Sequence, residues 1–187
     1  MCYSLFKWKY VVNLGCFVVF CGVAQQRFYG GILFRGNTTV NLDEKGRFAI
    51  PTRYRDRVQE ICACQLVATV AVNERGVGVD GCLWIYPLPA WEELENTIKK
   101  LSDLNKKAIK LKRFLIGYAA ECEMDSQGRL LLPEMLRKFA NLDKKMILVG
   151  QLNRFELWNE DAWNREQSEF KDNEDIEGLD ALGDLSF

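Results

Sequence analysis

The stretch DEKGRFAIPTRYR (residues 43–55) returns later in the chain as DSQGRLLLPEMLR (residues 125–137). The two segments share Asp, Gly, Arg, Pro and a final Arg at the same five of thirteen positions, and apolar residues match apolar residues between them. This internal repeat predicts the architecture, because a duplicated segment is expected to form the same supersecondary unit twice.

Each copy begins with the residues of a tight turn. The carboxylate of Asp43 or Asp125 can accept a hydrogen bond from a backbone N–H two or three residues on. Gly46 or Gly128 supplies the positive φ that such a turn needs. Both turns are therefore expected at the ends of hairpins. We call them the first tip and the second tip, residues 43–47 and 125–129.

A strand and a helix are expected after each tip. The apolar runs at residues 48–50 and 130–132 predict short buried strands. Pro51 and Pro133 follow, and the fixed φ and missing N–H of proline suit the first turn of a helix. Each copy therefore predicts a strand, a turn, a second strand and a short helix.

The repeat extends beyond these segments. Residues 66–72 and 146–150 are rich in β-forming residues, and each run leads to a second short strand, at 83–86 and 155–158. The first copy is longer at this point, and residues 73–81 predict an extended loop. Halves of about 50 residues are too small to bury a sufficient core separately, so we expect them to pack together as an intramolecular pseudo-dimer.

Two amphipathic helices are expected between the repeats. Apolar side chains fall at helical spacing from Trp91 onwards, and Asn105, a good N-cap, marks a break between the helices. The basic run that starts at Lys106 is interpreted as a solvated helix face. Four tryptophans are interpreted as core and interface packing, namely Trp84, Trp91, Trp158 and Trp163.

These segments together resemble the MraZ family. The resemblance is carried by FRGNTTVNLDEKGRFAIPTRYR, LWIYPLPAWEELE, DSQGRLLLPEMLR and MILVGQLNRFELWNEDAW, and it runs from about Leu33 to Phe187. A single D-x-x-G-R motif would be weak, but the doubled D-x-x-x-R motif with Tyr-Pro-Leu-Pro is specific. The resemblance implies two SpoVT-AbrB swapped-hairpin modules in one chain.

The expected fold is α+β and β-rich. Tandem swapped-hairpin (AbrB-like) half-barrels would form the intramolecular pseudo-dimer, with linking helices. In chain order we expect an N-terminal extension, the first SpoVT-AbrB repeat, the linking helices, the second repeat and an acidic tail, at residues 1–33, 34–90, 91–116, 117–163 and 164–187.

The resemblance also implies a function. It implies a bacterial transcriptional regulator that binds short direct repeats in double-stranded DNA upstream of the cell-division and cell-wall gene cluster, and that represses its own promoter. Such a protein acts as a ring-shaped homo-oligomer, without cofactor or small-molecule substrate. It is expected in the cytoplasm, associated with the nucleoid.

The distribution of charge is consistent with a nucleic-acid partner. The net charge of the chain is only −1, but residues 160–187 hold ten acidic residues against two basic ones. Residues 160–187 therefore carry −8, which leaves +7 for residues 1–159. A basic hairpin tip can place cations on phosphates and base edges, and arginine suits a bidentate contact to guanine.

The first tip is the stronger candidate for DNA contact. The second tip has Gln127 where the first has Lys45. Lys45 and Arg47 also stand where the resemblance implies DNA-contacting basic residues. The full set of candidate DNA-binding residues is Lys45, Arg47, Arg35, Arg53 and Arg129.

Other residues of the repeats have a structural interpretation. Asp43 and Asp125 are expected to cap the turns or to orient the adjacent arginine, and not to touch DNA. For Arg55 and Arg137, in the short helices, an interior salt bridge and a DNA contact are both open.

Enzyme chemistry finds little support. The chain has no histidine, which excludes Ser-His and Cys-His catalysis and histidine metal sites. Cys62-Ala-Cys64 lacks a second pair at zinc-finger spacing, and an odd count of seven cysteines is typical of reduced cytosolic thiols. Phosphate-loop and dinucleotide motifs are also absent from the sequence. We therefore expect no enzyme and no metal.

The N-terminus is an anomaly. Lys7 and Lys9 precede an apolar stretch at residues 10–24 that imitates a secretory signal, but it is short and glycine-interrupted for a membrane span. Members of the family usually begin at a Met before Phe-Arg-Gly, where Leu33 stands here, and a TTG or CTG codon can serve as a bacterial start. We favour a start assigned too far upstream over a true signal, an anchor or a genuine extension.

Two non-enzymatic alternatives stay open. A swapped-hairpin module also serves as the DNA-binding half of toxin-neutralising antitoxins, although those typically carry one copy and a toxin-binding tail. A secreted or membrane-tethered structural protein would follow if residues 1–32 are a real signal. The acidic tail, with few aromatic residues, is expected to be partly disordered, to dock as a short helix in a partner's groove, or to guard against DNA binding.

Overall fold

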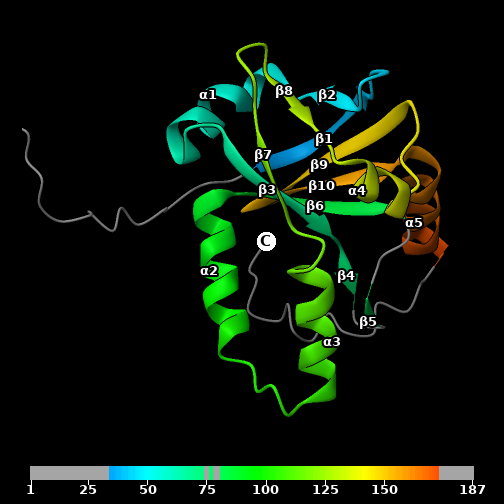
Figure 1. The fold of residues 1–187 in the computed structure, drawn as a ribbon. Helices are drawn as coiled ribbons and strands as arrows, with labels where there is room; N and C mark the ends of the chain where they lie inside the picture. The colour runs from blue at the N-terminus through cyan, green and yellow to red at the C-terminus, as the bar shows by residue number, and fades with distance from the viewer. Residues whose placement is uncertain (1–33, 74–75, 78–80, 173–187) are drawn as a thin grey trace, which may run out of the picture. The chain divides into compact units, whose positions relative to one another are not determined.

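A six-stranded antiparallel sheet forms the centre of the computed structural model, which describes residues 34–73, 76–77 and 81–172 (Figure 1). Its strand order is β1-β9-β10-β6-β3-β7, so the expected α+β, β-rich fold is confirmed. The strands are, in that order, Phe34–Asn41, Lys145–Leu152, Arg154–Asn159, Cys82–Pro87, Gln65–Val70 and Ala120–Glu123.

The sheet is shared symmetrically between the two repeats. β1 of the first repeat pairs with β9 of the second, and β7 of the second pairs with β3 of the first. The central pair, β10 with β6, joins the repeats again. Each repeat therefore completes the sheet of the other, as the expected pseudo-dimer requires.

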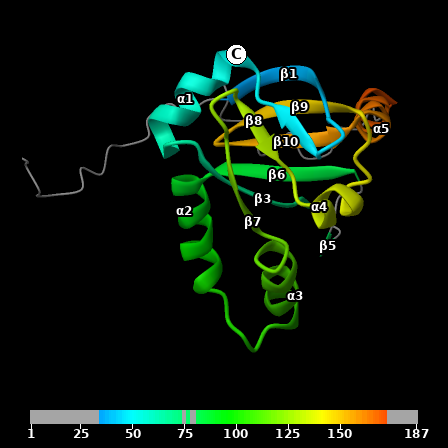
Figure 2. The same cartoon turned by 45° about the horizontal axis from the view of Figure 1, so that its top comes forward.

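A two-stranded ribbon lies against one face of the sheet. It consists of β2 (Arg47–Ala49) from the first repeat and β8 (Arg129–Leu131) from the second, in antiparallel pairing (Figure 2). Phe48 stands opposite Leu130 in this ribbon, and both side chains are buried. The two hairpins are thus swapped: each pairs with its counterpart from the other repeat.

The strand after each tip is only partly buried. Leu131 is 55% exposed between the buried Leu130 and Leu132, and Ala49 is exposed at the same position of the first copy. Side chains along a strand alternate between its faces, so the middle residue of each run points outward. The prediction of a wholly buried strand is wrong at that position.

The main core lies between the sheet and the ribbon. The rings of Phe34 and Phe155 lie with centroids 4.0 Å apart at an interplanar angle of 31°, and Tyr54 of α1 (Thr52–Cys62) meets both rings edge-on. Leu136 of α4 (Glu134–Phe139) is fully buried in the same core. Burial of each such side chain contributes about 1.5–3 kcal/mol, so this core holds both short helices against the sheet.

The helices begin one residue later than the prolines suggested. Pro51 and Pro133 are the N-cap residues of α1 and α4, with φ of −54° at both and ψ of 138° and 141°. Such extended ψ angles place each proline just outside its helix, and the first helical turn starts at the following residue.

The other face of the sheet carries three helices, α2 (Leu88–Lys99), α3 (Lys106–Leu115) and α5 (Glu160–Asp172). Trp91 of α2 packs on Val67 and Tyr86. The side chain of Asn105 caps α3 by accepting hydrogen bonds from two backbone N–H groups, so the predicted break there is confirmed. Figure 1 shows α2 and α3 as neighbouring helices on the side away from the ribbon.

Some expectations are corrected or fall outside the described residues. The segment 73–81 is not simply an extended loop, because β4 (Val72–Asn73) pairs with β5 (Gly76–Val77). The expectations for residues 1–33 and for the tail beyond Asp172 lie outside the described part of the chain. No described helix has the length and apolar character needed to cross a membrane.

Candidate nucleic-acid interface

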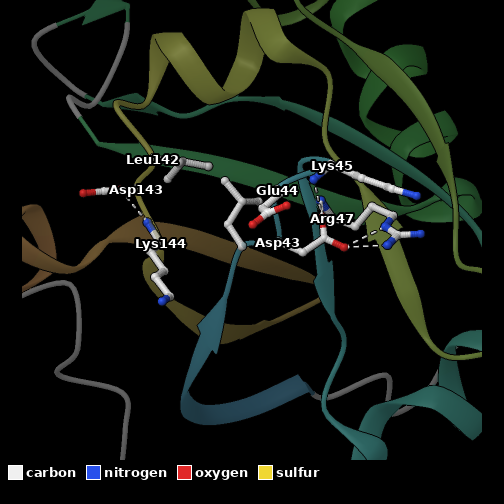
Figure 3. A pocket seen from close by; sticks show the side chains of 8 residues that line it. Asp43, Glu44, Lys45, Arg47, Leu142, Asp143 and Lys144 are labelled. Carbon is white, nitrogen blue, oxygen red and sulfur yellow. Dashed lines mark hydrogen bonds and ion pairs between the residues drawn. The ribbon is translucent and has the colours of Figure 1, made fainter.

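In the first tip, Asp43 holds both the turn backbone and the arginine that follows. Its Oδ1 accepts the backbone N–H groups of Lys45 at 2.9 Å and of Arg47 at 2.8 Å. Its Oδ2 accepts the Nε–H and Nη2–H of Arg47 at 2.8 and 2.7 Å (Figure 3). These bonds use only part of the N–H donors of the guanidinium, which is left oriented with donors to spare.

The second tip has the same geometry. Oδ1 of Asp125 accepts the backbone N–H groups of Gln127 and Arg129, both at 2.9 Å. Its Oδ2 accepts the Nε–H and Nη2–H of Arg129 at 2.8 and 2.7 Å. Gly46 and Gly128 have φ of +79° and +77°, a conformation that favours glycine. The two tips therefore differ in the side chains they carry and not in their backbone.

The ion pairs make the tips sensitive to acid. Hydrogen bonds from the Arg47 side chain lower the pKa of Asp43 below its ordinary value of 3.8, and those from Arg129 lower the pKa of Asp125. A carboxyl whose pKa is lower in the folded state stabilises that state above its unfolded pKa. This stabilisation is lost as the pH falls from about 3.8 through the lower folded value.

We predict that a carboxyl-carbon NMR titration will place the midpoints of Asp43 and Asp125 below 3.8. The substitution Arg47→Leu should raise the midpoint of Asp43 towards 3.8 and leave that of Asp125 unchanged, because it removes one ion pair only. Arg129→Leu is the matched variant for the second tip. Unchanged midpoints in both variants would show that the arginines do not hold these carboxylates.

Both tip arginines lie on the outer face of the ribbon. Arg47 is paired with Leu131, and Arg129 with Ala49, while Phe48 lies on the opposite, buried face. Residues at such diagonal positions of an antiparallel pair are separated by about 7–8 Å. The ribbon therefore carries two arginines at diagonal positions of one face, each with its guanidinium oriented by the aspartate of its own turn, and Ala49 and Leu131 occupy the other two positions.

The loop before β9 brings further cations to the first tip. The backbone N–H of Leu42 donates to the carbonyl of Lys144 at 2.9 Å, and Asn41 is paired with Lys145. A hollow of about 680 Å³ lies between this loop and the tip, and Figure 3 shows Lys45 and Lys144 among the side chains that line it. The sequence alone does not point to Lys144 in the loop or to Lys145 at the start of β9, because both belong to the second repeat.

At the second tip the corresponding loop is neutral. The backbone N–H of Met124 donates to the carbonyl of Cys64 at 3.0 Å, and Glu123 is paired with Gln65. Cys64 and Gln65 therefore stand where the first tip has Lys144 and Lys145. Residues 41–47 with 143–145 hold four basic and three acidic residues, a net of +1. Residues 123–129 with 63–65 hold one basic and two acidic residues, a net of −1. The first tip is thus the more basic one.

Arg35 and Arg53 do not gather at the first tip. Arg35 lies near the start of β1, and the tip follows the end of that eight-residue strand, about 20 Å away at a rise of about 3.4 Å per residue. The Nη2–H of Arg53 donates to the hydroxyl of Thr38 at 2.7 Å. Both arginines are exposed, but the structure separates them from Lys45 and Arg47.

Arg55 and Arg137 do not form the interior salt bridge that was one of their two interpretations. Their Nε–H groups donate to the backbone carbonyls of Ile50 and Leu132, at 2.7 and 3.1 Å. Within the described residues, neither guanidinium belongs to an ion pair. Each instead covers a tip of the opposite repeat.

Comparison with known proteins places the chain in a family. The family described as "MraZ protein, putative antitoxin-like" matches twice, over residues 33–114 and 115–182. A protein named "Transcriptional regulator MraZ" from Methylococcus capsulatus is 50% identical over 151 residues, which is 81% of this chain and 95% of that protein.

Two further relatives carry the same name. The protein from Alkalilimnicola ehrlichii is 47% identical over 155 residues, 82% of this chain and 99% of its own length. The protein from Escherichia coli is 45% identical over 154 residues, 82% of this chain and 95% of its own length. With two family matches and relatives at this identity along most of its length, the chain belongs to the MraZ family.

Proposed function

We propose that this chain is a sequence-specific, non-enzymatic transcriptional regulator that binds double-stranded DNA with the outer face of the β2–β8 ribbon. One observation carries the proposal. Arg47 and Arg129 occupy diagonal positions on that face, each held by a carboxylate of its own turn. The name shared by the relatives, "Transcriptional regulator MraZ", supports the same conclusion.

The ribbon suits a DNA groove on physical grounds. The major groove admits a two-stranded β-ribbon, and arginine can bind the O6 and N7 atoms of guanine with two N–H donors. Arg47 is already oriented by Asp43, so binding costs little further side-chain entropy. Of the two other side chains on this face, Ala49 is small and Leu131 is apolar and 55% exposed, so Leu131 would also face the groove.

The residues take different roles in this proposal. Arg47 and Lys45 read bases from the first tip, and Arg129 makes a weaker contact from the second. Lys144 and Lys145 bind phosphates beside the first tip, where they fix the register of the ribbon. Arg35 and Arg53 are proposed as phosphate contacts away from the groove-reading face.

The resemblance supports a more specific target. We propose that the operator consists of direct repeats upstream of the chain's own operon, in the cell-division and cell-wall gene cluster, and that binding represses that promoter. The protein would act as a ring-shaped homo-oligomer in the cytoplasm, associated with the nucleoid. Residues 34–90 and 117–163 are proposed as its two SpoVT-AbrB repeats.

Footprinting on the DNA upstream of its own gene tests the proposed function. The purified protein should protect a set of regularly spaced repeats, and excess DNA of unrelated sequence should not remove the protection. Protection that is uniform along the fragment, or absent at micromolar protein, would contradict sequence-specific regulation by this chain.

A further inference from the structure

Each tip is covered by an arginine of the opposite repeat. Arg137 of α4 lies over Gly46: a Cβ atom built on this glycine would stand 2.7 Å from the Cζ of Arg137 and 2.8 Å from its Nε. Arg55 of α1 lies over Gly128 in the same way: a Cβ atom built on Gly128 would stand 2.2 Å from the Nε of Arg55. Both glycines are buried although they belong to turns, because the guanidinium groups cover them.

The covering arginine is anchored to the residue that also binds the tip backbone. The Nε–H of Arg137 donates to the carbonyl of Leu132 at 3.1 Å, while the N–H of Leu132 donates to the carbonyl of Gly46 at 3.0 Å. The first tip is therefore held from the second repeat at two points. The second tip is held likewise by Arg55 and Ile50, with bonds of 2.7 Å to the Ile50 carbonyl and 2.8 Å to the Gly128 carbonyl.

We propose that Arg137 and Arg55 are positioning residues that act crosswise. Arg137, in the second repeat, holds the first tip in its DNA-binding conformation, and Arg55, in the first repeat, holds the second tip. The expected effect on DNA affinity rests on the proposed function, but the dependence of each tip's conformation on the opposite repeat can be measured in the protein without DNA. It supplies a physical reason for two repeats in one chain, since each tip is completed by the helix of the other.

Position, and not charge, is what these arginines contribute. A groove-reading side chain must be held to within about 0.5 Å of its productive geometry. Arg47 follows Gly46 directly, so a shift of the Gly46 backbone moves the guanidinium that reads the DNA. The planar guanidinium of Arg137 fills the space above Gly46 that a Cβ atom would otherwise take.

A matched pair of substitutions, Arg137→Met and Arg55→Met, tests the crossed dependence without DNA. Methionine keeps a long apolar stem and removes the planar donors. Arg137→Met should shift the backbone amide resonances of the first tip and leave those of the second near their wild-type positions. Arg55→Met should do the reverse. Shifts confined to the tip of the mutated repeat, or no shifts at either tip, would overturn the inference.

DNA binding gives the second readout. Arg137→Met should weaken binding to the operator about five- to tenfold, the size of one misplaced base contact, and Arg55→Met should weaken it less. The dependence of affinity on salt should not change in either variant. If Arg137 instead touches a phosphate, the salt slope falls by about 1 and Arg137→Lys restores affinity, which would also overturn the inference.

If the methionine variants do not fold, substitutions of the tip glycines test the same crossed contacts. Gly46→Ala should displace the Nε–H resonance of Arg137 and leave that of Arg55, and Gly128→Ala should do the opposite; a reversed pattern refutes the crossed contact. If the resonance shifts occur in the opposite repeat but the wild-type protein shows no sequence preference for DNA, the proposed function is refuted and this inference stands. Specific binding without crossed shifts would sink this inference alone.

Discussion

Replacing Lys45 and Arg47 with alanine should lower the affinity for operator DNA by at least about tenfold for each protomer, because a good base contact is worth roughly 1–3 kcal/mol. The two side chains lie on the more basic tip, whose preceding residues Asn41 and Leu42 pair with Lys145 and Lys144 through the backbone. Since Arg47 also binds Asp43, replacing it removes the ion pair of the turn as well as a cation. The single substitution Lys45→Ala separates the two effects, because it removes a cation and leaves the Arg47–Asp43 ion pair intact.

The matched control is Gln127→Ala with Arg129→Ala in the second tip. These substitutions remove the corresponding Arg–Asp ion pair from a turn of the same backbone geometry, but in a tip whose neighbouring loop is neutral. A mobility-shift titration at fixed salt should show a smaller loss, and circular dichroism should show that both variants fold. Equal losses at the two tips would refute the asymmetry, and no loss at either would remove the ribbon from the DNA interface.

Affinity should also rise steeply with the number of repeat boxes in the DNA. One ribbon offers few base contacts, whereas specific binding at physiological salt usually draws on many contacts spread over a larger interface. Linking protomers in a ring makes the later contacts intramolecular, and avidity can then rise by roughly 10²–10⁴ without a new kind of contact. We expect one box to bind weakly and two or three boxes, spaced near one helical turn of about 10 bp, to bind far more tightly.

Phasing provides the control for this prediction. Inserting half a turn between boxes places them on opposite sides of the duplex and should cancel most of the gain. The measurement is a titration on one, two and three boxes and on the half-turn insertion, with salt fixed because phosphate contacts are salt-dependent. Affinity that ignores box number and phasing would contradict the ring while leaving simple DNA binding possible.

The duplicated tip explains why much of the fold could be predicted. A turn of the form D-x-x-G-R is encoded locally: Asp43 binds N–H groups within four residues, and Gly46 adopts the positive φ by itself. The break at Asn105 is local too, since its side chain caps the next two backbone N–H groups. Such features need no knowledge of the rest of the chain.

What the sequence did not reveal depends on contacts between the repeats. Lys144 lies beside the first tip only because each repeat's loop adjoins the hairpin of the other. Aligning the repeats gives a signal, since the loop lysines stand where the first repeat has Cys64 and Gln65, but only the swapped topology shows which tip they serve. Arg53 shows the reverse situation: it lies close to the first tip in sequence, but its guanidinium donates to Thr38 of β1, so its proposed DNA contact is separate from that tip.

Crosslinking from the tips to DNA tests whether the ribbon is the DNA-binding surface. A photoreactive phenylalanine derivative can replace Glu44 in the first tip or Ser126, its exposed counterpart in the second, with exposed Glu93 of α2 as the control. We expect strong crosslinks to operator DNA from position 44, weaker ones from position 126 and none from position 93. Crosslinks from position 93 that equal those from position 44, or none from either tip in a protein that still binds the operator, would show that the ribbon does not bind the DNA.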